Sequence, residues 1–305
     1  MIEDVRAGLF RAGQKELPPT YFYDELGSRL FDEITRLPEY YPTRAEHALL
    51  AERAEEIIQL TAARALAELG AGTATKSRTL LRALTAGGSA QYLPLDVDGE
   101  TLAATAAALR QEFPLLEVIP LVADMRDDVE ARGTRHPLLY AFLGSTIGNF
   151  EPGAARDLLR RIRTTLRPTD RLLLGVDLIK DPSVLHAAYN DARGVTARFN
   201  KNVLRVINRE LGANFDVDAF DHRAFYDERQ TRIEMHLVST RDQHVSVPQL
   251  GDLHMARGET IRTEISAKYD HPSTAALLES AGFRMTEWMT GVDALVALAI
   301  AEPTA

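Results

Sequence analysis

Short runs of branched aliphatic and leucine residues alternate with longer stretches of helical periodicity between residues 60 and 177. This alternation predicts a parallel sheet whose faces are covered by helices. The clearest of the expected helices are Thr101–Phe113, which ends before a proline, and Pro152–Leu166, which begins with a proline that the first turn tolerates. The expected strands are Arg64–Leu69, Gln91–Leu95, Val118–Val122, Leu138–Leu143 and Arg171–Asp177.

The alternation breaks after Asp177 and returns near the C-terminus. A helix near Val195–Leu211 is followed by segments with the pattern of antiparallel strands, which we interpret as an insertion. These strands are expected at Arg232–Ser239, His244–Val247 and Thr260–Tyr269. A helix at Pro272–Ala281 and a hairpin of strands at Arg284–Met289 and Leu295–Ala301 then complete a main sheet of seven strands.

The N-terminal segment is predicted to form two helices before the first strand. One carries apolar residues at three- and four-residue spacing, and the other is opened by Thr43, with Glu46 completing a capping box. The apolar residues are Leu26, Leu30, Phe31, Ile34 and Leu37. We expect an α/β domain of residues 46–178 and 270–305, and a second domain of α+β type built from residues 1–45 and 179–269.

Composition and net charge indicate a globular protein and limit the kinds of molecule that it is expected to bind. The 305 residues are 45% hydrophobic and 26% charged, which suffices for a globular core. The net charge of -9 opposes binding to nucleic acid or to an anionic membrane, so a small molecule is the favoured partner. A monomer is expected, although the charge does not decide the oligomeric state. No apolar run reaches the roughly 18 residues of a membrane span. The N-terminus lacks the pattern of a secretory signal, so the cytoplasm is the expected compartment.

Several kinds of reactive site are excluded by residue type. The sequence has no cysteine, which rules out disulfides, thiolate metal ligands and a cysteine nucleophile. Its eight histidines lack HExxH or close paired spacing, so no metal site is expected. Neither a GxSxG elbow nor a GxxxxGK[ST] phosphate loop occurs.

A glycine turn follows the first expected strand, in the segment Glu68-Leu69-Gly70-Ala71-Gly72-Thr73-Ala74-Thr75-Lys76. Between a strand and a helix, Gly70 and Gly72 let a nucleotide cofactor approach the backbone. Asp96 ends the next strand, where a carboxylate accepts hydrogen bonds from both ribose hydroxyls. Thr75 replaces the third glycine of the dinucleotide fingerprint, which favours S-adenosylmethionine over NAD.

Three further residues extend this hypothesis. Asp124 follows the third strand, within reach of an adenine amino group, and Gly144 follows the fourth, where it leaves room for a sulfonium. Lys76 is expected in the first helical turn, where its ammonium can meet the methionine carboxylate. The alternatives are a plain tight turn for the glycines, helix N-caps for the two aspartates and a solvated position for the lysine.

Several longer blocks carry a family resemblance. They are Tyr21-Phe22-Tyr23-Asp24, Thr35-Arg36-Leu37-Pro38-Glu39-Tyr40-Tyr41-Pro42-Thr43-Arg44, Phe142-Leu143-Gly144-Ser145-Thr146-Ile147-Gly148-Asn149, Asn202-Val203-Leu204 and Asn208-Arg209-Glu210-Leu211. Over nearly its whole length the sequence resembles the histidine Nα-methyltransferases of ergothioneine biosynthesis, which trimethylate free L-histidine to hercynine. The resemblance implies a class I methyltransferase with a Rossmann-like seven-stranded sheet, S-adenosylmethionine as cofactor, S-adenosylhomocysteine as product, and the second domain as a substrate-binding lid.

Matching positions in the family imply the residue roles. Those around S-adenosylmethionine are Gly70, Lys76, Asp96, Asp124 and Met125, with Gly144 nearby. Those around the amino acid are Tyr23, Tyr40, Asn149, Tyr189, Met235, Glu264 and Ser266. Two positions depart from the family pattern. Met125 stands in place of a phenylalanine and still offers an apolar wall to adenine, and His236 replaces an aromatic residue at the rim of the amino-acid pocket.

The chemistry of methyl transfer is consistent with these roles. An in-line displacement at a sulfonium depends mainly on positioning, so Asn149, past the end of the fourth strand, is the candidate acceptor for an amine hydrogen, with Tyr23 beside it. Aromatic faces stabilise a growing methylammonium by about 0.5 to 2 kcal/mol. For any one tyrosine the alternative is interface packing with its hydroxyl in water.

The amino-acid side chain is assigned to one strand. Glu264 and Ser266 are two residues apart and so share a face, where the carboxylate would accept an imidazole N–H. The alternative is a polar stripe that faces solvent. Three functions therefore stay open: trimethylation of histidine, N-methylation of another aromatic amino acid such as tryptophan or tyrosine, and a non-catalytic protein that binds cofactor or amino acid.

Overall fold

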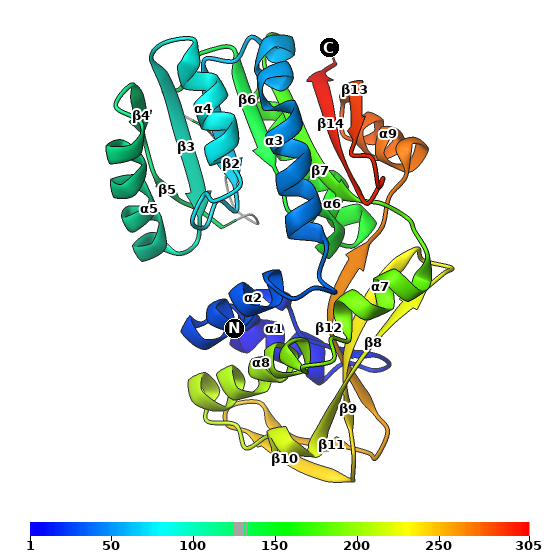
Figure 1. The fold of residues 1–305 in the computed structure, drawn as a ribbon. Coiled ribbons are helices and arrows are strands. Elements are labelled where there is room, and N and C mark those ends of the chain that lie inside the picture. The colour runs from blue at the N-terminus through cyan, green and yellow to red at the C-terminus, as the bar shows by residue number, and fades with distance from the viewer. Residues whose placement is uncertain (125–130, 132, 305) are drawn as a thin grey trace. The chain divides into compact units, whose positions relative to one another are not determined.

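The chain forms two compact units in the computed structural model, which describes residues 1–124, 131 and 133–304 (Figure 1). The first, called here the α+β unit, consists of Met1–Tyr41 and Lys180–Lys268. The second, the α/β unit, consists of Pro42–Ile179 and Tyr269–Ala305. Each unit therefore contains two separate parts of the chain.

The α/β unit is built around an eight-stranded sheet in the order β13-β14-β7-β6-β2-β3-β4, with β5 also paired to β3. The pairs of β2 with β3 and β6, of β6 with β7, and of β3 with β4 and β5 are parallel, whereas β14 is antiparallel to both β7 and β13. The strands are β2 (Ala65–Leu69), β3 (Ala90–Asp96), β4 (Leu116–Val118), β5 (Leu121–Val122), β6 (Leu138–Phe142), β7 (Arg171–Asp177), β13 (Phe283–Thr290) and β14 (Val296–Pro303).

The expected seven strands become eight because the third is interrupted. Residues Val118–Val122 were predicted as one strand, but the ladder breaks between β4 and β5, where Pro120 lies. Proline has no N–H to donate to a ladder, which explains the break. Both pieces still pair with β3, so the order of a seven-stranded sheet is preserved.

Helices of the α/β unit pack on its sheet and on one another. Alternate residues of β2, β6 and β7 join α6 and α9 in one apolar cluster that includes Leu158, Ile162 and Leu278. In the rest of this unit, α3 contacts α4, β7 and β14. The helices are α3 (Pro42–Thr61), α4 (Arg78–Ala86), α5 (Gly99–Glu112), α6 (Pro152–Thr165) and α9 (His271–Ser280), and the 3₁₀ helix η2 is Thr146–Asn149.

The α+β unit contains a four-stranded sheet in the order β1-β12-β9-β8 and a separate hairpin of β10 and β11. Its strands are β1 (Lys15–Glu16), β8 (Phe220–Asp227), β9 (Arg232–Ser239), β10 (Gln243–Val247), β11 (Gly251–Met255) and β12 (Thr260–Ala267). Its helices are α1 (Ile2–Leu9), η1 (Pro19–Phe22), α2 (Glu25–Thr35), α7 (Pro182–Tyr189), α8 (Val195–Leu211) and η3 (Val217–Ala219). Of these, α1, η1, α7, η3, β1, β8 and β11 were not predicted from the sequence.

A register shift in β12 decides which side chains share a face of this sheet. Arg262 pairs with His236 of β9, but Glu264 pairs with Met235, because the ladder is irregular between Arg262 and Glu264. Neighbouring residues of a strand point to opposite faces. Arg262 and Glu264 therefore lie on opposite faces although they are two residues apart, which no simple alternation predicts.

Candidate active site

The glycine turn and Asp96 meet at the end of the parallel strands β2 and β3. Gly70 and Gly72 have φ angles of 72° and 50°, in the left-handed region that favours glycine. The Gly70 N–H donates to Leu95 O at 2.8 Å, and the Gly72 N–H donates to Asp96 Oδ2 at 2.9 Å. A side chain at Gly72 would meet no atom within 4 Å, so the outer side of the turn is open.

Asp96 keeps acceptor capacity on this edge of the sheet. Besides the Gly72 contact, its Oδ1 accepts from the Asp98 N–H at 3.2 Å. A carboxylate offers about four lone-pair sites, so two remain for hydroxyl donors. Asp124 follows β5, and the Ala123 N–H donates to Asp96 O at 3.0 Å, which places both aspartates at one sheet edge. An open turn beside such an acceptor fits an adenosine with its ribose hydroxyls.

Lys76 lies in the turn before α4 rather than in the first helical turn, and its ammonium is paired with Glu46 of α3. Glu46 is 3% exposed, and it also accepts the Gly144 N–H at 2.7 Å and 2.9 Å through its two oxygens. A side chain at Gly175 would come within 2.2 Å of Glu46 Oε1, so only glycine leaves room for the carboxylate. Lys76 is therefore held beside Gly144.

Glu46 was interpreted from the sequence as part of a capping box, and this was wrong. The helix begins at Pro42, so Thr43 lies inside it and cannot be its N-cap. The signal that was missed is the position of Glu46 in the buried stripe of α3 with Leu49, Leu50 and Ala54. A charged residue in such a stripe is rarely buried without a partner.

Asn149 ends the short helix η2, which begins just past β6. The turn into η2 contains Gly144 and Ser145, with φ angles of 79° and 55°. The Ser145 hydroxyl accepts the Asp177 N–H at 2.7 Å, which anchors the turn to β7. The half-buried Asn149 thus lies beyond the carboxyl end of a parallel strand, as the sequence suggests, where α/β sheets bind ligands.

Glu68 lies at the base of the glycine turn and is 4% exposed. The hydroxyls of Ser77 and Tyr92 both donate to its Oε2. Burial raises the pKa of the Glu68 carboxyl to about 7, although these hydrogen bonds act in the opposite direction.

The three predicted tyrosines are brought together in the α+β unit. The rings of Tyr40 and Tyr189 meet edge to face with centroids 6.2 Å apart. Tyr23 packs edge-on against Phe31 and Phe199 at 5.7 Å and 5.6 Å, and Phe31 in turn packs against Tyr40. Although Tyr23 is 46% exposed, desolvation of its hydroxyl raises the pKa of that group, and the charge of Glu264 and the two other tyrosines raises it further.

The segment that carries Tyr23 is fixed by α8. Asn202 is 1% exposed, and its amide donates to Phe22 O at 3.3 Å and to Asp24 Oδ1 at 2.7 Å. Asp24 also caps α2 by accepting the Gly27 N–H at 2.8 Å. These contacts hold the residues on both sides of Tyr23, and so they fix the backbone from which its ring extends.

Glu264, Ser266 and Met235 share one face of the sheet, as the pairing of β12 with β9 requires. Burial raises the pKa of the Glu264 carboxyl to about 7, and the charge of Lys268 acts in the opposite direction. The Tyr189 hydroxyl donates to Ser266 Oγ at 2.8 Å. Lys268 also donates to Ser266 Oγ at 2.8 Å. It was not predicted as a site residue, although its spacing of two residues from Ser266 and four from Glu264 could have placed it on the same face of the strand.

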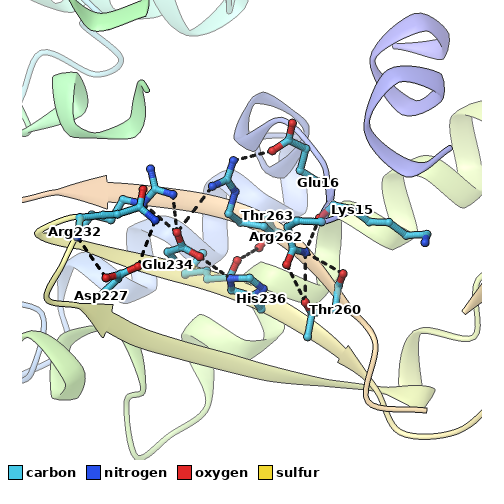
Figure 2. A network of polar contacts seen from close by, with 12 residues as sticks. Lys15, Glu16, Asp227, Arg232, Glu234, His236, Thr260, Arg262 and Thr263 are labelled. Atoms are coloured by element: carbon cyan, nitrogen blue, oxygen red, sulfur yellow. Dashed lines mark hydrogen bonds and ion pairs between the residues drawn. The ribbon is translucent and has the colours of Figure 1, made fainter. Parts of the chain in front are cut away.

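His236 lies on the opposite face of β9 and does not form the rim of this group. It is 5% exposed, and its Nε2 is 2.9 Å from Glu234 Oε2 (Figure 2). Its ring stacks on that of Phe225. Glu234 also accepts from Arg232 Nε at 2.9 Å. Burial alone would raise the pKa of Glu234, but these two donors lower it below its ordinary value. Arg262 of β12 joins this network, with its Nη1 3.7 Å from Glu234 Oε1, and so connects β12 to β9 (Figure 2).

Three further predictions from the sequence concern Met125, metal binding and membrane spans. Met125 lies outside the residues that the structure describes. Within the described part of the chain, no group of three or more histidine or acidic side chains is arranged to hold a metal ion. The helices in that same part are all too short or too polar to cross a bilayer.

The sheet order and the glycine turn with its carboxylate define a class I S-adenosylmethionine-dependent methyltransferase fold. The structure is similar to that of an S-adenosylmethionine-dependent methyltransferase from Clostridium acetobutylicum, with a TM-score of 0.52, 10% sequence identity, and coverage of 91% of this chain and 99% of that chain. Residues 1–303 match the family model for "Histidine-specific methyltransferase, SAM-dependent". The chain belongs to this family.

Relatives of known name include a Histidine N-alpha-methyltransferase from Mycolicibacterium smegmatis, which is 47% identical over 94% of this chain and 90% of its own length. The Ergothioneine biosynthesis protein 1 of Neurospora crassa is 33% identical over 92% of this chain, which spans 32% of that longer protein.

Glu68 gives a testable dependence of stability on pH. Between the unfolded pKa of 4.5 and the folded value of about 7, the folded state keeps a proton that the unfolded chain has lost. Stability of the α/β unit therefore falls as the pH rises through this window, by on the order of 3 kcal/mol. Glu68→Gln should remove this loss. Urea unfolding followed by fluorescence of Trp288, the single tryptophan, measures it because Trp288 lies in β13.

The matched control is Glu55→Gln on the exposed surface of α3, which should keep the wild-type pH dependence. A Glu68→Gln protein that loses as much stability as the wild type between about pH 5 and about pH 8 would show that Glu68 does not hold a proton when folded.

Proposed function

We propose that this enzyme transfers methyl groups from S-adenosylmethionine to the α-amino group of free L-histidine, three times in succession, to give hercynine, a step of ergothioneine biosynthesis. The match of the family model over both units carries the proposal. The geometry supports it, because a cofactor turn lies in one unit and a half-buried carboxylate suited to an imidazole N–H lies in the other.

The α/β unit supplies the cofactor site. Asp96 holds the ribose hydroxyls with its two remaining acceptor positions, and Asp124 accepts from the adenine amino group. Gly70 and Gly72 form the turn that lets adenosine reach the backbone. Gly144 leaves space for the sulfonium, and Lys76, held beside it by Glu46, binds the methionine carboxylate. Met125 belongs to this set by family resemblance alone.

S-adenosylmethionine supplies an electrophilic methyl group on a positively charged sulfur. The enzyme's own contribution is to orient a neutral amine in line with that methyl group. The amide oxygen of Asn149 accepts one amine hydrogen, and Tyr23 steers the same group, so that the nitrogen lone pair points at the methyl carbon. The faces of Tyr40 and Tyr189 stabilise the positive charge that accumulates on the nitrogen.

The α+β unit selects the side chain. Glu264 accepts an imidazole N–H, Ser266 bonds the same ring, and the buried Met235 closes the apolar side. A substrate without the N–H cannot donate this hydrogen bond to the Glu264 carboxylate, which costs about 1 to 3 kcal/mol or more.

The proposal is tested by incubating the protein with S-adenosylmethionine and an equimolar pool of free amino acids. Histidine should gain one to three methyl groups by mass spectrometry. Methylation of tryptophan or tyrosine with histidine unchanged would assign another aromatic amino acid, and the absence of any methylated product would contradict the proposed activity.

Asp96→Asn should weaken binding of S-adenosylmethionine by about 1 to 3 kcal/mol, because the amide offers fewer acceptor positions and no charge to the ribose hydroxyls. Calorimetric titration measures the change. Asp98→Asn is the matched control, since Asp98 lies two residues away and caps α5, and asparagine also serves as a helix cap. Equal affinities for the two variants would remove Asp96 from the cofactor site.

Asn149→Ala should lower kcat by on the order of a hundredfold while the affinity for S-adenosylmethionine stays near the wild-type value, because a displaced amine reacts slowly even when it is bound. Single-turnover kinetics with saturating histidine, together with calorimetry of the cofactor, measures the two quantities. Wild-type turnover by this variant would rule out the acceptor role of Asn149.

Glu264→Gln should reduce the ratio of kcat/KM for histidine over tryptophan by about ten- to a hundredfold, since the charged acceptor for the imidazole N–H is lost. The assay is run at about pH 8, above the pKa of about 7, so that wild-type Glu264 is ionised. Glu259→Gln, which precedes the same strand and pairs with Lys15, is the control and should keep the ratio. An unchanged ratio in Glu264→Gln would place the imidazole elsewhere.

A further inference from the structure

A buried lysine lies beside the residues assigned to the imidazole. Lys268 directly follows β12 and is 3% exposed. Its backbone N–H donates to Thr231 O at 2.8 Å, which fixes its Cα. Its ammonium donates to Ser266 Oγ at 2.8 Å and to the Tyr189 hydroxyl at 3.3 Å, and it lies 5.0 Å from the centroid of the Tyr189 ring.

The ammonium fixes the direction of the neighbouring hydrogen bonds. A lysine ammonium has three donors and no acceptor, so both hydroxyl oxygens accept from Lys268. The Tyr189 hydroxyl in turn donates to Ser266 Oγ. Ser266 Oγ therefore accepts two hydrogen bonds, which fills its two lone pairs. The remaining capacity of this hydroxyl is its own hydrogen, which must be donated elsewhere.

We propose that Lys268 is a positioning residue that makes Ser266 a hydrogen-bond donor toward the substrate, so that this face of the sheet accepts the neutral imidazole ring in a single tautomer. The inference rests on the proposed function, because it concerns how Glu264 and Ser266 recognise the imidazole ring of the substrate. Neither Lys268 nor a choice of tautomer belongs to the roles assigned above.

The donor on Ser266 and the acceptor on Glu264 favour a neutral imidazole over an imidazolium. Glu264 and Ser266 share a face, and they present an acceptor and a donor respectively. A neutral imidazole carries one N–H and one acceptor nitrogen, and therefore satisfies both. An imidazolium carries two N–H groups, one of which would face the Ser266 hydrogen. It would also bring a second positive charge close to the ammonium of Lys268.

The test compares histidine with its two pyrrole analogues, in which one or the other ring nitrogen is replaced by C–H. These analogues keep an N–H for Glu264 and lack the acceptor for Ser266. At about pH 8 the wild type should prefer histidine over the better analogue by about tenfold or more in kcat/KM, because a donor without an acceptor costs about 1 to 3 kcal/mol.

Lys268→Met should raise KM for histidine and reduce this preference to about twofold, because the Ser266 hydroxyl is then free to turn and to accept as well as donate. Lys15→Met is the matched control: it removes another lysine of this sheet, one paired with Glu259, and should keep the wild-type preference. Calorimetric titration with S-adenosylmethionine checks that the α/β unit of each variant is intact.

A folded Lys268→Met protein with the wild-type preference overturns the inference. If that variant does not fold, Ser266→Ala replaces it. Ser266→Ala should likewise reduce the preference to about twofold, because it removes the donor itself, and an unchanged preference would equally overturn the inference. A wild type that does not methylate histidine contradicts the proposed function instead, so the two failures are distinguishable.

Discussion

A carboxylate that leaves water must find hydrogen-bond donors, and this constraint shapes the local structure of both units. Glu46 meets it with the Gly144 N–H and the ammonium of Lys76, and in doing so it ties α3 to the turn after β6. Glu68 meets it with two hydroxyls at the base of the glycine turn. Each contact holds a segment of the proposed cofactor site, so the buried acids act as structural supports there.

The need of a buried carboxylate for hydrogen-bond donors also distinguishes two glutamates of the α+β unit, Glu234 and Glu264. Glu234 lies in a network with Arg232 and His236, and its donors lower its pKa despite burial. Glu264 lies on the other face, where burial raises its pKa to about 7. A group that titrates near neutral pH can change its charge state when a ligand arrives, whereas a strongly paired one cannot. The register shift in β12 is what keeps these two environments apart.

The sequence predicted well the parts of the fold that are determined by local pattern. Helix Val195–Leu211 and strand Arg232–Ser239 have the expected bounds, because their apolar spacing is long and regular. Asp96 and Gly72 meet because parallel neighbours end at one edge. Strand β8 was missed, since its polar residues mask the alternation and one of them, His222, bonds to the Tyr189 carbonyl.

The roles of Glu46, His236 and Lys268 depend on contacts between residues distant in sequence or on a register shift, and periodicity does not encode either. Side-chain spacing alone would have put Arg262 and Glu264 on one face, where an arginine could neutralise the carboxylate proposed to bind the substrate. The irregular ladder prevents this, and the charge of Lys268 acts on Glu264.

Two lysines, Lys76 and Lys268, show why a binding site benefits from fixing its cations before the ligand arrives. A free lysine side chain loses about 1.5 to 2 kcal/mol of conformational entropy when it is immobilised. Here that cost is met on folding, since Glu46 holds one ammonium and the Ser266 and Tyr189 hydroxyls hold the other. A fixed ammonium also fixes the hydroxyls around it, because it can only donate. Preorganised polarity of this kind lets a small amino acid be recognised by direction of hydrogen bonding as well as by shape.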